Sequence, residues 1–276
     1  WSMQFYPAGE TIARRLLSLR LQRTEWVITG ARASEVVAAG FQQRAPDQTQ
    51  FVHPESGDLY QLARHQYFDE GAGQLRFLCN PGVTLENELA TRPLTILAMA
   101  SDGDTIIDPF DGQDDLIAGV LRHVSPDYVH VPQNLLATAV WAARLRIWGF
   151  RVAHSTFKLM KRMAEPAVLE KLPQAEIADA VMQALDSPQP SEFFRVLHRC
   201  GALAAISRDL DALFEPVDRQ HGGAEAPREM LALDRAAAET DNLSTVIKRF
   251  YQLLGDQADR VFSALGLAPA AGAQPD

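Results

Sequence analysis

The apolar pattern of the chain changes at Pro132, and this change constrains the fold more than any other feature of the sequence. Before it, runs typical of strands, such as Glu25–Thr29 and Leu59–Arg64, alternate with helical patterns such as Thr11–Leu21. After it, the apolar residues recur at helical spacing throughout. We therefore expect an α+β fold, in which a mixed-sheet domain is followed by helices only.

The same patterns divide the chain into three parts. We expect an α+β domain over residues 3–130, a helical domain over residues 131–215 and a short helical extension over residues 228–266. Residues 216–227, with two glycines at their middle, are typical of a linker, and the chain from Ala268 onward is typical of a frayed end. The sequence leaves open whether the last helices fold onto the second domain or form a dimer.

Composition narrows the class of protein. Of the 276 residues, 47% are hydrophobic and 22% are charged, which is ordinary for a folded globular chain. No apolar run approaches the roughly 18 residues that a membrane helix needs. Cys79 and Cys200 lie far apart and form neither a metal motif nor a disulfide framework. We therefore expect a cytoplasmic protein without a membrane partner.

Charge is distributed unevenly along the chain. The net charge is −9, yet residues 132–172 hold seven Lys or Arg against two Asp or Glu. Such a basic segment agrees with contact to a phosphate backbone, although charge alone favours an ordinary solvated helix face. Arg144, Lys158 and Arg162 are its candidate RNA-binding residues.

The sequence predicts no metal site. The histidines are scattered and form neither H-x-x-x-H nor H-E-x-x-H. The aspartates between Asp102 and Asp111 do not have the spacing of a calcium loop, and they favour a hairpin turn followed by a helix cap, for which Asp111 is the candidate. The segment His65–Gln74, rich in glycine and acidic residues, is predicted to be a mobile loop.

Several short segments, taken in order, resemble the head and neck of the bacterial tRNA nucleotidyltransferases (the CCA-adding enzymes) and the related poly(A) polymerases. The segments are Glu25–Val27, Phe51–Pro54, Tyr60–Arg64, Arg92–Ile96, Ile106–Gly112, Leu121–Pro126, Trp141–Arg144, Gly149–Arg151 and Phe193–Leu197. They are collinear over about residues 3–215. The resemblance implies a nucleotidyltransferase-type head, an all-helical neck, and tRNA or another RNA as partner.

The residues that carry the chemistry in this family differ here. The family holds two metal ions with a D-x-D pair on a strand, and the matching positions are Arg23 and Glu25. One carboxylate beside an arginine is a poor magnesium site, because the two cations repel each other. We therefore expect no catalytic residue beyond the remnant Glu25 and no cofactor. Mg²⁺ enters only in the alternative of a rearranged site, built from Glu25 and a carboxylate near Asp58.

The family's triphosphate-binding segments are altered as well. Its G-G-x-x-R-D turn keeps one glycine, Gly9, and places Glu10 beside it. Its R-R-D-x-x-x-N segment keeps Arg92 but has Pro93 and Leu97 in place of the aspartate and the asparagine. A nucleotide or RNA would therefore meet only part of the family's binding groups.

The base-reading motif of the neck is also lost. The family's E-D-x-x-R becomes His130–Asn134, which leaves Gln133 and Asn134 to bond a base edge. Together with the positions above, the candidate nucleotide- or RNA-binding residues are Gly9, Arg64, Arg92, Gln133, Asn134, Arg144, Lys158 and Arg162.

Three functions agree with this pattern. The first is a binding module for RNA or a nucleotide that has lost nucleotide addition. The second is an active RNA nucleotidyltransferase with a rearranged metal site, and the third is a scaffold for a protein partner. Simultaneous change at the metal site, the triphosphate turn and the base-reading motif favours the first.

Overall fold

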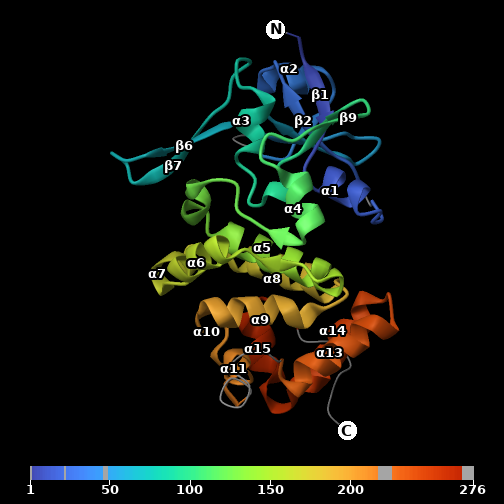
Figure 1. Cartoon of the computed structure of the whole chain (residues 1–276), viewed down its shortest axis with the longest axis vertical. Helices are drawn as coiled ribbons and strands as arrows, with labels where there is room; N and C mark the ends of the chain where they lie inside the picture. The colour runs from blue at the N-terminus through green and yellow to red at the C-terminus, as the bar shows by residue number, and fades with distance from the viewer. Residues whose placement is uncertain (1, 22, 46–48, 217–225, 269–276) are drawn as a thin grey trace. The chain divides into compact units, whose positions relative to one another are not determined.

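The computed structural model describes residues 2–21, 23–45, 49–216 and 226–268 (Figure 1). The chain forms two compact units. The first comprises Trp1–Ala118 and Arg122–His130, and the second comprises Gly119–Leu121 and Val131–Asp276. Most of the expected linker and all but the first residue of the expected frayed end lie outside the described residues.

A five-stranded mixed sheet organises the first unit. Its strands are β1 (Gln4–Pro7), β2 (Glu25–Thr29), β3 (Gln42–Gln43), β4 (Gln50–Val52) and β5 (Leu59–Leu62), and their spatial order is β1-β2-β5-β4-β3. The central pair β2–β5 is parallel, and the other pairs are antiparallel. The mixed sheet confirms the α+β assignment for this part of the chain.

Strand β2 is buried on both faces, because neighbouring residues of a strand point to opposite sides of the sheet. Val27 packs in one apolar cluster with Ala63 and Leu89. Ile28 packs in another with Phe51. This double burial fixes the register of β2 and so fixes the position of Glu25, the first residue of the strand.

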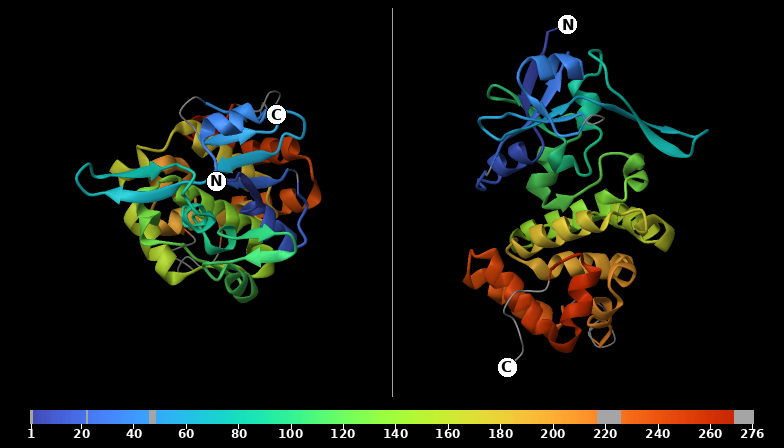
Figure 2. Two further views of the ribbon diagram at one scale, coloured as in Figure 1. Left: turned by 90° about the horizontal axis from the view of Figure 1, so that it is seen from above. Right: turned by 180° about the vertical axis from the view of Figure 1, so that it is seen from behind.

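The remaining elements of the first unit lie outside this sheet and can be followed by colour in Figures 1 and 2. They are α1 (Glu10–Leu16), α2 (Ala33–Ala38), β6 (His65–Asp69), β7 (Gln74–Leu78), α3 (Leu85–Leu89), the 3-10 turn Thr95–Leu97, β8 (Ala100–Asp102), β9 (Thr105–Ile107), α4 (Gly112–Ala118) and the 3-10 turn Pro126–His130.

The segment His65–Gln74, predicted to be a loop, begins instead with a strand. β6 pairs with β7 in an antiparallel hairpin that extends away from the sheet (Figure 1). The Asp69 carboxylate stabilises the turn, because it accepts hydrogen bonds from Ala72 N at 3.1 Å and from Arg76 Nε at 2.6 Å. The prediction was wrong because it read the turn chemistry and missed the strand pairing around it.

Helix α4 has a different cap from the one expected. The Asp108 carboxylate accepts hydrogen bonds from Gly112 N at 2.7 Å and from Gln113 N at 2.9 Å. Asp111 instead has φ +59°, and its backbone carbonyl accepts from Asp115 N. The carboxylate before the turn therefore satisfies the free N–H groups of the helix start.

The second unit is helical apart from the short parallel pair β10 (Val120–Leu121) and β11 (Arg151–Val152) in the described residues. Its helices are α5 (Gln133–Leu145), the 3-10 turn Arg146–Trp148, α6 (His154–Met163), α7 (Pro166–Leu169), α8 (Gln174–Leu185), α9 (Pro190–Cys200), α10 (Leu203–Ile206), α11 (Arg208–Ala212), α13 (Arg228–Glu239), α14 (Leu243–Leu254), the 3-10 turn Gly255–Gln257 and α15 (Ala258–Ala264). Within the described residues, no helix is both long and apolar enough to cross a membrane.

The C-terminal helices fold onto the second unit, which answers a question that the sequence left open. Helix α13 packs against α9, and α14 packs against α13 and α8. Phe250 lies between Phe194 and Phe262, with ring centroids 5.4 and 5.7 Å away. All three rings are fully or almost fully buried. The extension therefore shares one apolar core with α9.

A partly buried carboxylate at this junction is expected to make the stability of the second unit depend on pH. Asp234 of α13 accepts hydrogen bonds from Ser191 N at 2.8 Å and from Ser191 Oγ at 2.6 Å. Burial raises the pKa of Asp234 above its ordinary value, although the bonds from Ser191 oppose this shift. The folded state therefore holds this proton more tightly than the unfolded chain does.

We expect Asp234→Asn to weaken the dependence of the free energy of unfolding on pH. In the wild type, Asp234 contributes to the free energy of unfolding, and this contribution is fully present below the pKa of the group in the unfolded chain. It is lost as pH rises through the pKa in the folded state. The free energy of unfolding then changes by at most about 1.4 kcal/mol per pH unit. Urea unfolding from acidic to neutral pH measures the difference between variant and wild type. The exposed Asp241→Asn is the control. If the free energies of unfolding of wild type and Asp234→Asn change with pH in the same way, Asp234 is not the group responsible.

Candidate functional site

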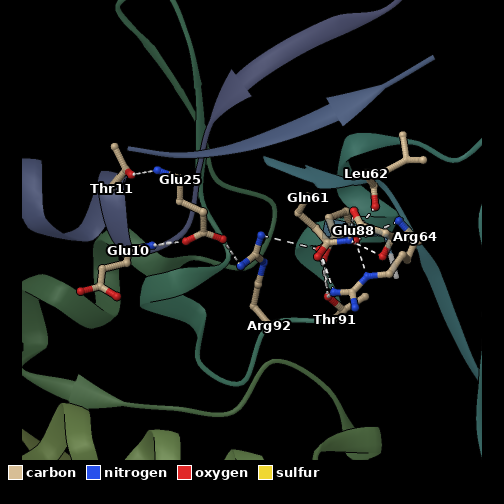
Figure 3. A network of polar contacts seen from close by, with 10 residues as sticks. Glu10, Thr11, Glu25, Gln61, Leu62, Arg64, Glu88, Thr91 and Arg92 are labelled. Carbon is tan, nitrogen blue, oxygen red and sulfur yellow. Dashed lines mark hydrogen bonds and ion pairs between the residues drawn. The ribbon is translucent and has the colours of Figure 1, made fainter. Parts of the chain in front are cut away.

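Glu25 lies where β2 begins, next to the start of α1. Its carboxylate is held from two sides (Figure 3). Oε2 accepts a hydrogen bond from the backbone N–H of Glu10 at 3.2 Å, and Oε1 forms a short ion pair with Nη1 of Arg92. The backbone N–H of Glu25 donates to Thr11 Oγ1 at 2.7 Å. Both carboxylate oxygens are therefore engaged by groups of the same chain.

Gly9 makes this arrangement possible. It precedes α1 with φ +63° and ψ −128°, a conformation open almost only to glycine. A Cβ atom at this position would lie 2.4 Å from Glu25 Oε2. The N–H of Gly9 also donates to Met99 O at 2.9 Å, which fixes the turn. The glycine that matches the family's triphosphate turn thus gives room to a carboxylate here.

Arg92 joins Glu25 to a second acid. It follows α3, and its Nη2 lies 3.6 Å from Oε1 of Glu88, a side chain with no exposed surface. Burial by itself would lower the pKa of the Arg92 guanidinium, but the carboxylates of Glu25 and Glu88 raise it above its ordinary value. The guanidinium is therefore a permanent positive charge between two acids.

Arg64 completes the network from the other side of Glu88. Its backbone N and its Nε donate to Glu88 Oε2 at 2.8 and 3.1 Å, and its Nη2 donates to Oε1 at 3.1 Å. The same guanidinium lies 5.0 Å from the ring centre of Phe77. Two arginines that were candidate ligand-binding residues thus share one buried glutamate, as Figure 3 shows.

Sequence reasoning missed Glu88, although a signal was present. In the segment Leu85–Leu89, the glutamate lies on the same helical face as both leucines, and Leu89 is fully buried. A charged residue at a core-facing position requires a buried partner of opposite charge. Two of the candidate arginines, Arg64 and Arg92, are those partners.

The residues around Glu25 do not fit a pair of divalent cations. Both of its oxygens are occupied, and the charge beside it is the guanidinium of Arg92. Arg23, at the other position of the family's carboxylate pair, is exposed. Asp58 instead accepts a hydrogen bond from Thr24 N at 2.8 Å. Within the described ranges, no group of three or more His, Cys, Asp or Glu side chains is arranged to hold a metal ion.

The other five candidate residues belong to the second unit. Gln133 and Asn134 begin α5, where Asn134 is buried with 8% of its surface exposed. Arg144, on the last turn of α5, donates to Gln183 Oε1 at 2.9 Å and lies 4.9 Å from the ring centre of Trp141. Lys158 and Arg162 are exposed on α6, one turn apart.

The structure therefore brings Gly9, Arg64 and Arg92 together around Glu25 and Glu88. In the second unit, the candidates on α5 are partly engaged in packing, whereas those on α6 point outward. The two tryptophans of this region also differ. Trp141 is buried, while Trp148, in the 3-10 turn after α5, is half exposed.

Comparison with curated proteins finds relatives that are named multifunctional CCA protein. No protein-family model matches the chain. The multifunctional CCA protein of Pseudomonas aeruginosa (strain LESB58) is 42% identical over 214 residues, which cover 77% of this chain and 52% of that protein. The protein of the same name from Ectopseudomonas mendocina (strain ymp) is 37% identical over 244 residues, or 87% of this chain and 59% of that one. The chain thus spans about half the length of the curated relatives it matches.

Solved structures share the fold. A tRNA nucleotidyltransferase complexed with a primer tRNA and an incoming ATP analog matches 97% of this chain and 78% of its own, with a TM-score of 0.68 and 19% identity. The Bacillus stearothermophilus CCA-adding enzyme in complex with CTP matches 95% of this chain and 79% of its own, with a TM-score of 0.62 and 16% identity. These matches confirm the expected α+β fold with a nucleotidyltransferase-type head and a helical neck.

Proposed function

Because the chain is homologous over 77% of its length to the bacterial CCA-adding tRNA nucleotidyltransferases, we propose that it is an RNA-binding member of this family that no longer adds nucleotides. The proposed ligand is tRNA or a similar structured RNA, bound in the cytoplasm without a metal cofactor. The function rests mainly on one observation, the ion pair between Arg92 and Glu25.

The ion pair opposes nucleotide transfer for an electrostatic reason. Two-metal catalysis needs two divalent ions on the order of 4 Å apart, which bridge the attacking and leaving oxygens. The guanidinium of Arg92 neutralises Glu25 but offers no coordination site, and it repels an incoming cation. Its raised pKa keeps it charged at any physiological pH. Glu88 holds the same guanidinium from the opposite side.

Binding of RNA is supported by separate observations. A solved structure with the same fold is described as a nucleotidyltransferase complexed with a primer tRNA. Within the described residues, Lys158 and Arg162 have exposed side chains and form no hydrogen bond or ion pair with another residue. Cations of this kind are free to contact phosphates.

The second candidate is an active enzyme with a rearranged metal site. Glu25 pairs with Leu59 in the parallel register of β2 and β5, so that Asp58 directly precedes its partner on the neighbouring strand. Because neighbouring residues of a strand point to opposite faces, the Asp58 side chain starts on the other face of the sheet from Glu25. A shared metal site therefore needs this segment to rearrange and both carboxylates to leave Arg92 and Thr24. This rearranged site would use Mg²⁺ or Mn²⁺.

We expect no incorporation of labelled CTP or ATP into tRNA that lacks its 3′ end, with Mg²⁺ or Mn²⁺, while the same tRNA is retained in a filter-binding assay. A full-length relative is the positive control for incorporation. Incorporation that Glu25→Ala abolishes would contradict the proposal and establish the active enzyme. Absence of both incorporation and tRNA retention would leave the scaffold as the remaining function.

A further inference from the structure

The outward face of α6 carries basic side chains that the described residues of the second unit leave unpaired. We propose that this face binds the phosphate backbone of RNA without reading its sequence. The proposal rests on the RNA-binding function above and names the surface that carries it.

Helical periodicity separates the two faces of α6. Thr156, Met160 and Met163 are fully or almost fully buried, and they lie on one side of the helix. Lys158 and Arg162 lie four residues apart on the opposite side, where they are neighbours along one ridge and are both exposed. The sequence of α6 contains no acidic residue.

The neighbouring side chains extend the positive charge. Lys161 and Arg199 both lie 5.3 Å from the ring centre of Phe157, so that a cation of α6 and one of α9 share an aromatic ring. Such contacts hold long side chains near the surface without neutralising their charge. The basic face therefore continues from α6 onto the end of α9, within the same unit.

Two other arginines of this unit are neutralised by acids. Arg195 is paired with Glu192, and Arg260 is paired with Asp209 at 2.9 Å. By contrast, His154, Lys158 and Arg162 form no hydrogen bond through their side chains and no ion pair with any described residue. In a chain of net charge −9, an unpaired basic ridge is complementary to a polyanion.

The chemistry of the ridge favours a nucleic-acid backbone over other ligands. Its exposed positions carry ammonium and guanidinium groups, which contact phosphates, and the ring of His154, whose stacking on a base would not depend on the sequence. Binding is therefore expected to depend on salt and to be independent of base sequence.

The test compares two double variants that each remove one lysine and one arginine from exposed helical positions of the second unit. Lys158→Gln/Arg162→Gln changes α6, and Lys248→Gln/Arg249→Gln changes α14. Filter binding of tRNA is measured for the wild type and both variants between about 50 and 300 mM monovalent salt. Circular dichroism and thermal unfolding check that both variants fold.

We expect the α6 variant to lose two phosphate contacts. Its slope of log K against log salt should fall by roughly 1.5, and its affinity near 0.1 M salt should fall on the order of 30-fold, whereas the α14 variant should bind like the wild type. Polyglutamate should compete much less well than an RNA of unrelated sequence.

Each contrary outcome has a distinct meaning. If the wild type binds tRNA and both variants bind equally well, the assignment of the α6 face is wrong while the proposed function stands. If the wild type itself does not bind tRNA, the proposed function fails. If polyglutamate displaces tRNA as effectively as RNA does, the surface is one for acidic proteins and the inference is overturned.

Discussion

Glu88→Gln is expected to lower the free energy of unfolding of the first unit by about 3–5 kcal/mol, the usual cost of removing one partner from a buried ion pair. The carboxylate has no exposed surface and receives three N–H groups of Arg64, while Arg92 lies 3.6 Å away. Without it, the Arg64 guanidinium loses its carboxylate partner, and Arg92 keeps only that of Glu25. Urea unfolding, with amide exchange in β2 and β5 as a local readout, measures the loss.

Helix α3 offers a matched control for this substitution. Glu86 lies two residues before Glu88 on the same helix and is exposed. Glu86→Gln should change stability by less than about 0.5 kcal/mol, as surface substitutions usually do. Equal effects of the two substitutions would mean that the buried network does not stabilise the first unit.

Gly9→Ala is expected to destabilise the first unit by about 3 kcal/mol, because a strained backbone costs about 1–3 kcal/mol and the site loses an ion pair as well. The added Cβ would lie 2.4 Å from Glu25 Oε2 and would displace the carboxylate from Arg92 and from the N–H of Glu10. The same unfolding and exchange measurements apply.

The substitution Gly57→Ala measures the backbone strain without the loss of an ion pair. Gly57 also has a positive φ, +71°, but a Cβ built on it meets no atom within 4 Å. Gly57→Ala should therefore cost only the backbone strain, about 1–2 kcal/mol. A loss as large as that of Gly9→Ala would show that the contact between Gly9 and Glu25 contributes nothing.

Much of the fold could be predicted from the sequence, because its signals are local. The alternation around Glu25–Thr29 and the helical spacing after Pro132 reflect which faces are buried, and burial is what the structure shows for β2 and α5. The hairpin β6–β7 was missed, since its pairing joins residues on either side of a glycine-rich turn. Turn chemistry alone does not reveal the partner strand.

The site was harder to predict, because its contacts join distant parts of the chain. The sequence marked Gly9, Glu25 and Arg92 through their resemblance to a polymerase, and from that resemblance the arginines were expected to face a ligand. The ion pair of Arg92 with Glu25 joins residues far apart in the sequence. Its ion pair with Glu88 involves a helix position that faces the core. Only the tertiary structure shows that these charges are satisfied internally.

The ion pairs of Arg92 with Glu25 and Glu88 make it difficult to obtain a two-metal site by a single substitution. A bound metal ion dissociates, but this cation is part of the polypeptide and stays wherever the fold is intact. Removal of Arg92 alone would leave two acids without compensation, and a new aspartate at position 23 alone would stand beside an acid already neutralised. Under the proposed function, restoring a pair of metal-binding carboxylates therefore needs more than one substitution.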